Sequence, residues 1–326
     1  MRIVVTGGAG FIGANLTATL LDRGHTPVVV DDLSTGAPSN LAGLDVTLLE
    51  GTILDRELLD QACAGADAIV HLAARPSVPR SIADPVASHR VNATGTLEVL
   101  EAARRAGGLP LVVASSSSVY GSNPTLPKSE DLRTQPMSPY AVSKLATEQY
   151  ALAYGACFAL PVLPLRFFNV YGPLQAPGHA YAAALPVFLD HALQGLPIPI
   201  DGDGEQTRDF TYVGSVTAAI ATAVERGLTS HEPINLAFGT RRSILDALDA
   251  LEQQLGVELE RQHRPPRAGD VRHSQADGSR LRALLPDLEP EPFEVGLGAT
   301  IDWFVDLPAY ADSEVADKVR AARAVG

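Results

Sequence analysis

Short apolar runs alternate with amphipathic stretches along most of the chain. The first run, residues 2–6, is followed by a glycine-rich turn and then by apolar positions at helical spacing through Leu16, Leu20 and Leu21. Further apolar runs predict strands at residues 27–30, 46–50, 68–71, 111–115, 162–168 and 234–237. Helical patterns lie between them, near residues 56–62, 85–105, 139–154 and 215–226. This alternation predicts an α/β fold with a Rossmann-type, doubly wound parallel sheet.

The alternation weakens after residue 168, where loops rich in Pro and Gly begin. We place a domain change there. Residues 1–168 form the first domain, with residues 209–238 returning to it, and residues 169–208 and 239–326 form a smaller, partly interleaved domain. In the smaller domain the pattern predicts a helix at 185–194, a short strand at 197–200, a helix beginning at Ser243 and an amphipathic helix within 309–326.

Composition narrows the choice of partners. The 326 residues are 46% hydrophobic and 19% charged, which is typical of a soluble globular protein. No apolar run approaches the roughly 20 residues of a membrane span, and the N-terminus enters a strand rather than a signal-peptide pattern, so we expect a cytoplasmic protein. The net charge of -13 argues against nucleic acid or an anionic membrane as partner. Two cysteines indicate neither a disulfide framework nor a metal site.

The glycine turn is the first candidate binding element. Gly7, Gly10 and Gly13 lie between a predicted strand and a predicted helix, where the backbone can approach a pyrophosphate at the positive end of the helix. The second strand ends at Asp31 and Asp32, where a carboxylate can bind both hydroxyls of an adenosine ribose. A carboxylate would repel a 2'-phosphate, so NAD is predicted rather than NADP. The alternative, that these acids only open the following loop, suits Asp32 better than Asp31.

Polar and small residues also follow the later strands. His71 ends the fourth strand and is followed by Leu72, Ala73 and Ala74, at the edge where such sheets bind ligands. We interpret His71 as structural rather than catalytic. Asn92 is expected to hydrogen-bond the loops around the cofactor, although a helix-packing amide is an alternative. Four consecutive serines, residues 115–118, end the fifth strand and exceed what capping requires, so at least one should face a ligand.

Tyr140 and Lys144 are spaced four residues apart and therefore share one face of the predicted helix. A free tyrosine has a pKa of about 10, and a nearby ammonium charge is one way to bring its phenolate within reach at neutral pH. The pair suits a general base and its electrostatic partner. By itself, such spacing also occurs by chance on solvated helix faces.

Together these motifs resemble one family, the extended short-chain dehydrogenases that act on nucleotide sugars, and within it the UDP-sugar 4-epimerases. The resemblance covers the chain to about residue 305, in the family's order. The stretches that carry it are residues 6–13, 31–36, 71–74, 115–121, 140–144, 166–173, 208–210 and 267–270.

The resemblance implies a role for each matching residue. Tyr140 would be the base, Lys144 would contact the nicotinamide ribose and Ser116 would bind the sugar hydroxyl. The implied cofactor contacts are Gly7, Gly10, Phe11, Ile12, Gly13, Asp31, Asp32, Ser34, Thr35, Gly36, Thr52, Ile53, Leu72, Ala73, Ala74, Asn92, Tyr140 and Lys144. The implied substrate contacts are Ser116, Ser117, Ser118, Tyr140, Asn169, Arg208, Arg267, Asp270 and Ser274. Family members also pair two helices from each subunit, which implies a homodimer through residues 85–105 and 139–154.

Two positions depart from the family pattern. After the third strand the family usually has Gly-Asp, with the Asp contacting adenine, whereas this chain has Gly51-Thr52-Ile53. We expect Thr52 to donate a hydrogen bond instead, or the backbone to suffice. Where the family has Asp-Asp, this chain has Gly214-Ser215, which we interpret as a changed helix cap because serine caps about as well as aspartate.

The serine run indicates the reaction. At the serine run, sugar 4,6-dehydratases of the family have a sequence that resembles Ser-Thr-Asp-Glu-Val-Tyr-Gly, and its Asp and Glu serve elimination. This chain has Ser117 and Ser118 at those two positions. We therefore expect reversible oxidation at carbon 4, which is epimerisation with NAD regenerated. A 4-ketosugar reductase and a binding-only protein are the other classes; the intact triad disfavours the second.

The sugar is less constrained. Strict glucose/galactose enzymes of the family tend to carry Tyr where this chain has Ser274, and residues 180–183 (Ala-Tyr-Ala-Ala) are similar to N-acetylhexosamine epimerases. Both features predict room for a 2-acetamido group. A UDP-glucuronate 4-epimerase ranks second, because residues 176–179 lack the arginine that those enzymes tend to show. The sequence does not decide between UDP and dTDP.

Overall fold

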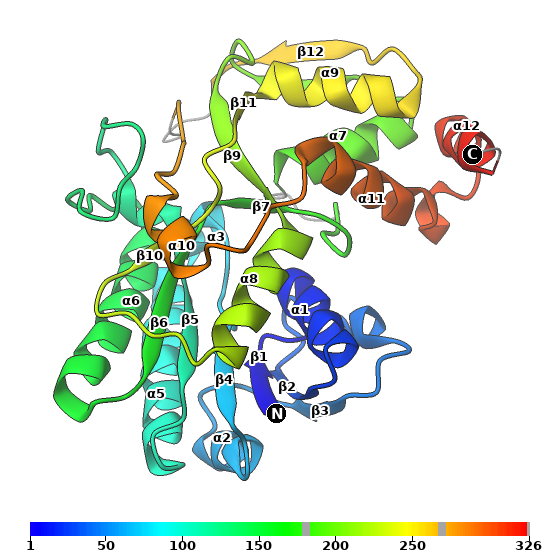
Figure 1. The fold of residues 1–326 in the computed structure, drawn as a ribbon. Coiled ribbons are helices and arrows are strands. Elements are labelled where there is room, and N and C mark those ends of the chain that lie inside the picture. Colours follow the sequence, from blue (N-terminus) through cyan, green and yellow to red (C-terminus); the bar gives the residue numbers. More distant parts are fainter. Residues whose placement is uncertain (178–182, 267–271, 325–326) are drawn as a thin grey trace.

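The computed structural model describes residues 1–177, 183–266 and 272–324, and Figure 1 shows their arrangement. The larger domain is built on a seven-stranded parallel sheet with the strand order β10-β6-β5-β4-β1-β2-β3. Its strands are β1 (Arg2–Thr6), β2 (Thr26–Asp31), β3 (Thr47–Glu50), β4 (Ala68–His71), β5 (Leu111–Ser116), β6 (Val162–Phe167) and β10 (Ile234–Leu236). The predicted doubly wound sheet is confirmed.

Helices cover both faces of this sheet because alternate residues of each strand point to opposite sides. They are α1 (Phe11–Asp22), α2 (Arg56–Cys63), α5 (Gly95–Arg105), α6 (Pro139–Phe158) and α8 (Val213–Glu225). Ile3 and Val5 of β1 pack in one apolar core with α1 and α8, whereas Val4, between them, packs in a second core with α2 and α5. Near-continuous apolar strands, rather than alternating ones, follow from this two-sided burial.

The helix expected at 85–105 is helical throughout but not regular. It consists of α4 (Pro85–His89), a π-helical turn (Arg90–Thr94) and α5. A short helix, α3 (Val78–Ala83), precedes it. The π-helical turn contains Asn92, and such turns are often found at functional sites.

Local chemistry explains where α6 begins and ends. The Ser138 side chain accepts a hydrogen bond from the Ala141 N–H, and Pro139 occupies the first helical position, where no N–H is needed. Ala159 ends the helix in the left-handed conformation with φ of 52°. The 20-residue helix therefore has a defined start only two residues before Tyr140.

The elements of the proposed smaller domain lie beyond the carboxyl edge of the parallel sheet (Figure 1). It holds a three-stranded sheet, β11-β9-β7, and a two-stranded sheet, β12-β8. These strands are β7 (Asn169–Tyr171), β8 (Ile198–Asp201), β9 (Thr207–Tyr212), β11 (Arg241–Ser243) and β12 (Arg261–Arg264). Its helices are α7 (Ala184–Leu193), α9 (Ile244–Leu255), α11 (Phe293–Val305) and α12 (Glu314–Arg323), which share one apolar core. The expected helices at 185–194, after Ser243 and in the tail correspond to α7, α9 and α12.

The proposed return to the first domain at residue 209 falls within β9, which pairs with β7 and β11, whereas β10 pairs with β6 of the seven-stranded sheet. The expected role of Ser215 as a helix cap is wrong. Ser215 does not cap α8: Tyr212 is the N-cap, and Ser215 Oγ instead accepts a hydrogen bond from the Glu291 N–H at 2.9 Å. Ser215 therefore ties α8 to a segment far away in sequence. The two-domain division itself stays a proposal.

Another short helix, α10 (Ser279–Leu284), lies next to β10. Within the described ranges, no helix is long and apolar enough to cross a membrane.

Candidate active site

Several of the predicted site residues lie at the carboxyl edge of the parallel sheet. Strand register brings Thr6 of β1 beside Val30 of β2 and His71 of β4, so the segments that follow these strands start at one level. Ser116 lies at the end of β5 on the same edge. This edge is where ligands bind in open α/β sheets.

The glycine turn is packed too closely for side chains. A Cβ at Gly13 would lie 2.1 Å from the Gly7 carbonyl oxygen, and a Cβ at Gly7 would lie 2.7 Å from the Ala73 nitrogen. Gly7 also has φ of 71°, a conformation that favours glycine. The turn before α1 therefore brings backbone close to the segment after β4, a cradle that fits the pyrophosphate of NAD at the helix N-terminus.

Asp31 is buried, with 8% of its surface exposed, and accepts hydrogen bonds from two backbone amides. The Ala9 N–H donates to Oδ2 and the Leu33 N–H to Oδ1, each at 2.9 Å. Burial raises the pKa of this carboxyl, and the backbone hydrogen bonds oppose that rise. Asp31 thus holds the glycine turn against the loop after β2; its contact with a ribose remains a prediction.

The loop after Asp31 is also locally held. Asp32 Oδ1 accepts hydrogen bonds from the backbone N–H and the hydroxyl of Ser34, which agrees with its interpretation as a loop residue. A Cβ at Gly36 would lie 2.7 Å from the Ala9 carbonyl carbon, so this glycine allows the loop to touch the turn. The predicted adenosine side of the site is thus one compact unit.

His71 is structural, as expected. Thr6 Oγ1 lies 2.7 Å from Nδ1 and Thr96 Oγ1 lies 3.0 Å from Nε2, so both ring nitrogens have partners. Burial, helped by the nearby Lys144 charge, lowers the pKa of His71 to about 3. The imidazole is therefore neutral at physiological pH and unsuited to proton exchange there.

Asn92 holds a loop of the site, as one of its two interpretations predicted. Its Oδ1 accepts a hydrogen bond from the Arg75 N–H at 2.6 Å, and its Nδ2 donates to the Arg75 carbonyl and to Ser143 Oγ. One amide therefore connects the segment after β4 to α6. Since α6 carries Tyr140 and Lys144, Asn92 links the cofactor loop to the proposed base.

The structure brings Ser116, Tyr140 and Lys144 together across the contact between β5 and α6. The Tyr140 phenol lies near enough to the Ser116 hydroxyl for that hydroxyl to lower its pKa, and Lys144 Nζ donates to the Ala114 carbonyl at 2.6 Å. Ser116 Oγ also accepts hydrogen bonds from the Ser118 N–H and hydroxyl. The catalytic roles of the three residues remain predictions.

Burial dominates the electrostatics of the pair. Burial raises the pKa of Tyr140, with the Ser116 hydrogen bond acting against it, and no lowering by Lys144 is found. Burial lowers the pKa of Lys144 to about 8. The physical reason is that both groups lose water, which disfavours phenolate and ammonium alike. A lowering of the Tyr140 pKa by the Lys144 charge therefore stays a prediction.

The predicted substrate residues are only partly described. Asn169 is exposed at the start of β7, while the Arg208 guanidinium donates to the carbonyls of Thr207 and Arg272. The Ser274 N–H donates to the Thr207 carbonyl, which places Ser274 beside the strand that carries Arg208. Arg267, Asp270 and residues 180–182 lie outside the described residues.

The unusual Gly51-Thr52-Ile53 segment follows β3. Thr52 Oγ1 accepts a hydrogen bond from the Leu54 N–H at 3.3 Å, and Ile53 is buried against Gly95 of α5. Contact of either residue with adenine stays a prediction.

Several buried polar residues near the site carried no role in the sequence prediction. Asp209 is fully buried, accepts a hydrogen bond from the Ala276 N–H, and has its pKa raised to about 7 by burial. Glu148 and Arg166 form a buried ion pair between α6 and β6. Glu148 had one usable signal, because it follows Lys144 by the same four residues that separate Lys144 from Tyr140.

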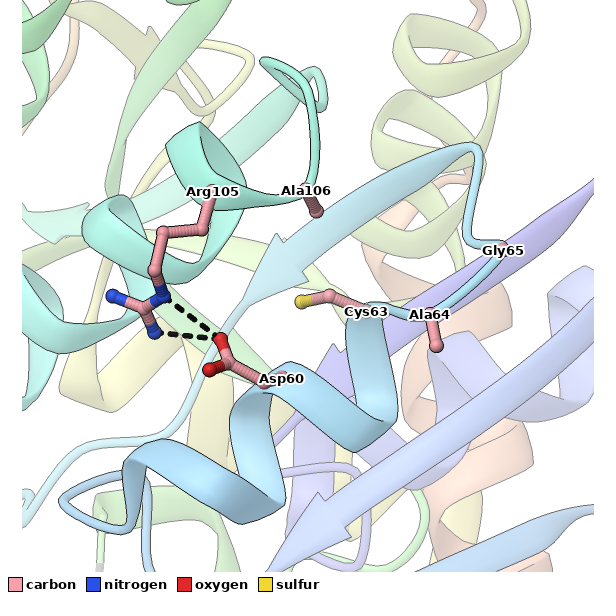
Figure 2. Close-up of a pocket in the computed structure, with 6 residues that line it drawn as sticks. All are labelled: Asp60, Cys63, Ala64, Gly65, Arg105 and Ala106. Atoms are coloured by element: carbon pink, nitrogen blue, oxygen red, sulfur yellow. Dashed lines mark hydrogen bonds and ion pairs between the residues drawn. The ribbon is translucent and has the colours of Figure 1, made fainter.

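A hollow of about 330 Å³ lies between the ends of α2 and α5 (Figure 2). Its lining includes Cys63 and the ion pair of Asp60 with Arg105. Both helices end just before strands begin, so this hollow lies at the amino edge of the sheet, opposite Tyr140. Burial raises the pKa of the Cys63 thiol to about 11, which makes it a poor nucleophile. The hollow is therefore separate from the candidate active site.

The chain is similar to known proteins over most of its length. Residues 3–237 match the model of the NAD dependent epimerase/dehydratase family. A UDP-glucose 4-epimerase of Mycolicibacterium smegmatis is 36% identical over 310 residues, which cover 93% of this chain and 98% of the relative. A dTDP-glucose 4,6-dehydratase of Streptomyces niveus is 35% identical, covering 95% of this chain and 94% of the relative. The solved UDP-N-acetylglucosamine 4-epimerase of Methanobrevibacter ruminantium M1, in complex with UDP-N-acetylmuramic acid, has a TM-score of 0.88 and 33% identity, covering 93% of this chain and 98% of its own.

A doubly wound parallel sheet with a tight glycine turn, an acid after β2 and a Ser–Tyr–Lys group at β5 defines a dinucleotide-dependent enzyme. More particularly, the chain belongs to the NAD dependent epimerase/dehydratase family. The resemblance inferred from the sequence, with its NAD cofactor, is thereby confirmed.

Replacing Gly13 by Ala should weaken NAD binding at least tenfold and destabilise the protein by about 1–3 kcal/mol, because the new methyl group overlaps a backbone oxygen. NAD titration followed by fluorescence and thermal unfolding measure the two effects. Gly298→Ala is the matched control: it is also a helical glycine, and its nearest neighbour is the flexible Gln254 side chain at 3.3 Å. If Gly298→Ala changed NAD binding and stability as much as Gly13→Ala, the role of the glycine turn in holding NAD would be contradicted.

Proposed function

We propose that this family member is an NAD-dependent 4-epimerase of a UDP-sugar. It oxidises carbon 4 of the sugar, lets the 4-keto sugar turn, and reduces it from the opposite face. The observation that carries the proposal is the meeting of Ser116, Tyr140 and Lys144 at the end of β5, with serines rather than acids at positions 117 and 118.

In the proposed reaction Tyr140 exchanges the proton of the 4-hydroxyl. Ser116, which interacts with the phenol, orients that hydroxyl toward it. The hydrogen bond from Lys144 Nζ to the Ala114 carbonyl holds the ammonium group at the end of β5. When bound, NAD supplies the hydride acceptor, and the positive charge of its nicotinamide ring favours a neighbouring phenolate. The nicotinamide charge would therefore lower the pKa of Tyr140, which burial raises.

Dehydration is the alternative that the family name leaves open, and the serine run argues against it. Loss of water across carbons 5 and 6 needs a positioned acid and base. The Ser118 hydroxyl donates to Ser116 at 2.9 Å, and Ser117 has no ionisable group to offer. Neither serine can serve as the acid or as the base of an elimination at neutral pH.

The nucleotide is proposed to be held by its diphosphate while the sugar turns. Arg208, on β9, supplies a planar donor fork suited to phosphate oxygens. Asn169 begins the neighbouring strand β7 and is paired in register with Phe210, two residues after Arg208. Holding one end of the substrate allows the other end to present either face to the same hydride acceptor.

We extend the proposal to substrates with a 2-acetamido group. Ser274 is a small, partly buried residue whose backbone pairs with Thr207, next to Arg208. A residue of this size leaves room beside the sugar that a tyrosine would fill.

The active species is proposed to be a homodimer formed through α4 and α6. Exposed apolar side chains gather on these packed elements: Val86 is 76% exposed, Val142 51% and Tyr150 41%. On α6 the two lie eight residues apart, which is one helical face. An exposed apolar face of this kind marks an interaction surface.

A cytoplasmic location completes the proposal. The exposed free thiol of Cys157 suits a reducing compartment. Fractionation of the source cells tests it.

Tyr140→Phe should lower kcat for interconversion of UDP-glucose and UDP-galactose by about 10³-fold or more, because the proton acceptor is removed. Binding of the UDP-sugar should change less than about threefold, since the ring remains. Resolving the epimers after incubation measures the rate. Tyr154→Phe, on the same helix but bonded to Glu101 at 2.7 Å, serves as control and should keep its rate. Wild-type turnover by Tyr140→Phe would sink the assignment.

Ser274→Tyr should depress kcat/KM for UDP-N-acetylglucosamine by about 10–100-fold while changing that for UDP-glucose only slightly, because the added ring fills space needed only by the acetamido group. Parallel assays with both substrates measure this. Equal losses on the two sugars would refute the gatekeeper role of Ser274.

Val142→Glu should convert the dimer to a monomer, because it introduces a charge into the proposed apolar interface. Sedimentation velocity at micromolar concentration measures the state. Val295→Glu is the matched control, since Val295 on α11 is also about half exposed, at 53%. The proposed interface would be contradicted if the wild-type protein were a monomer. It would also be contradicted if Val295→Glu dissociated the dimer as Val142→Glu does.

A further inference from the structure

Besides the partly buried Tyr140 and the buried Lys144, helix α6 carries a buried carboxylate, Glu148, on the face that meets the sheet. Glu148 follows Lys144 by four residues, so the three side chains share one helical face. The Glu148 side chain is 0% exposed, and its partner Arg166 on β6 is 3% exposed. Removing both charges of this ion pair from water costs a large free energy of desolvation, so net stabilisation does not by itself explain the pair.

The Glu148 carboxylate connects α6 to two neighbouring strands. Arg166 donates to it twice, from Nε to Oε2 at 2.8 Å and from Nη2 to Oε1 at 2.7 Å. The Ser115 hydroxyl of β5 donates to Oε2 at 2.7 Å. A two-point fork of this kind defines direction as well as distance, unlike apolar packing.

Arg166 is itself held in place. Its guanidinium lies over the Tyr120 ring, 4.8 Å from the centroid, and Nη1 donates to the Glu130 carbonyl. The Tyr120 hydroxyl in turn donates to Asn235 Oδ1 at 2.6 Å. Arg166 is therefore held by contacts outside α6, and its hydrogen bonds to Glu148 connect α6 to this fixed group.

The same short stretch of β5 meets all three helix residues. The Ala114 carbonyl accepts a hydrogen bond from Lys144, the Ser115 hydroxyl donates one to Glu148, and the Ser116 side chain interacts with the Tyr140 phenol. A small rotation or slide of α6 would move Tyr140 away from Ser116. Displacements of about 1 Å at a reacting group can cost about 100-fold in rate.

We propose that Glu148 and Arg166 are positioning residues, whose paired fork, with Ser115, fixes the rotation and axial position of α6 so that Tyr140 meets Ser116. The inference rests on the catalytic roles proposed for Tyr140 and Ser116. Neither Glu148 nor Arg166 touches the substrate in this scheme.

The test is the double variant Glu148→Met/Arg166→Met. It removes both charges together, and apolar replacement of a buried ion pair commonly leaves stability unchanged or improved. We expect a folded protein in which kcat falls about 10–100-fold while KM changes less than about threefold. The pH profile of kcat should shift, because Tyr140 and Lys144 change surroundings. Full kcat in the folded double variant, or a loss that appears only in KM, would overturn the inference.

Ser115→Ala provides a second measure that does not unbalance buried charge. It removes one hydrogen bond to Glu148 and should lower kcat about 3–10-fold with KM retained. If the double variant does not fold, this variant decides, and unchanged kcat refutes the proposal. Tyr154→Phe is the control, because it removes one hydrogen bond between α6 and another element, α5, away from β5.

Tyr140→Phe, assayed beside these variants, separates the two levels of inference. If Tyr140→Phe keeps its activity, the proposed function itself fails. If Tyr140→Phe is inactive and the positioning variants keep full kcat, only the role of Glu148 and Arg166 fails.

Discussion

The contact between α6 and the carboxyl end of β5 is the interaction on which the candidate site depends. Tyr140 and Lys144 would be two polar groups on a helix if β5 did not present Ser116 and the Ala114 carbonyl to them. The parallel sheet makes this meeting possible, because it brings the ends of β1, β2, β4 and β5 to one edge. The glycine turn and the serine run consequently face the same space.

Burial is the common cause of the site's electrostatics. It raises the pKa values of Asp31 and Tyr140 and lowers those of His71 and Lys144, since each charged form loses water. The protein offsets these costs with hydrogen bonds from backbone and side chains rather than with exposed charge. Burial therefore disfavours both the phenolate of Tyr140 and the ammonium of Lys144.

Members of the family catalyse several reactions on one fold, and few side chains distinguish these reactions. A 4-epimerase and a 4,6-dehydratase match this chain at 36% and 35% identity, so overall similarity does not distinguish the chemistry. In the proposed function the difference rests on the two residues directly after β5, Ser117 and Ser118, which stand where the resemblance predicts an acid pair in the dehydratases. Function is thus argued from these side chains, not from the fold.

By itself, the sequence determined what depends on neighbours along the chain: apolar runs for buried strands, Gly7 to Gly13 for a tight turn, and the spacing of Tyr140 and Lys144 for one helical face. Only the tertiary structure decided contacts between distant residues. The Glu148 fork with Arg166, the Ala276 amide on Asp209 and the pairing of β9 with β7 and β11 depend on strand register and packing. The raised pKa of Tyr140 belongs here too, because desolvation comes from everything packed around the phenol and not from Lys144 four residues away.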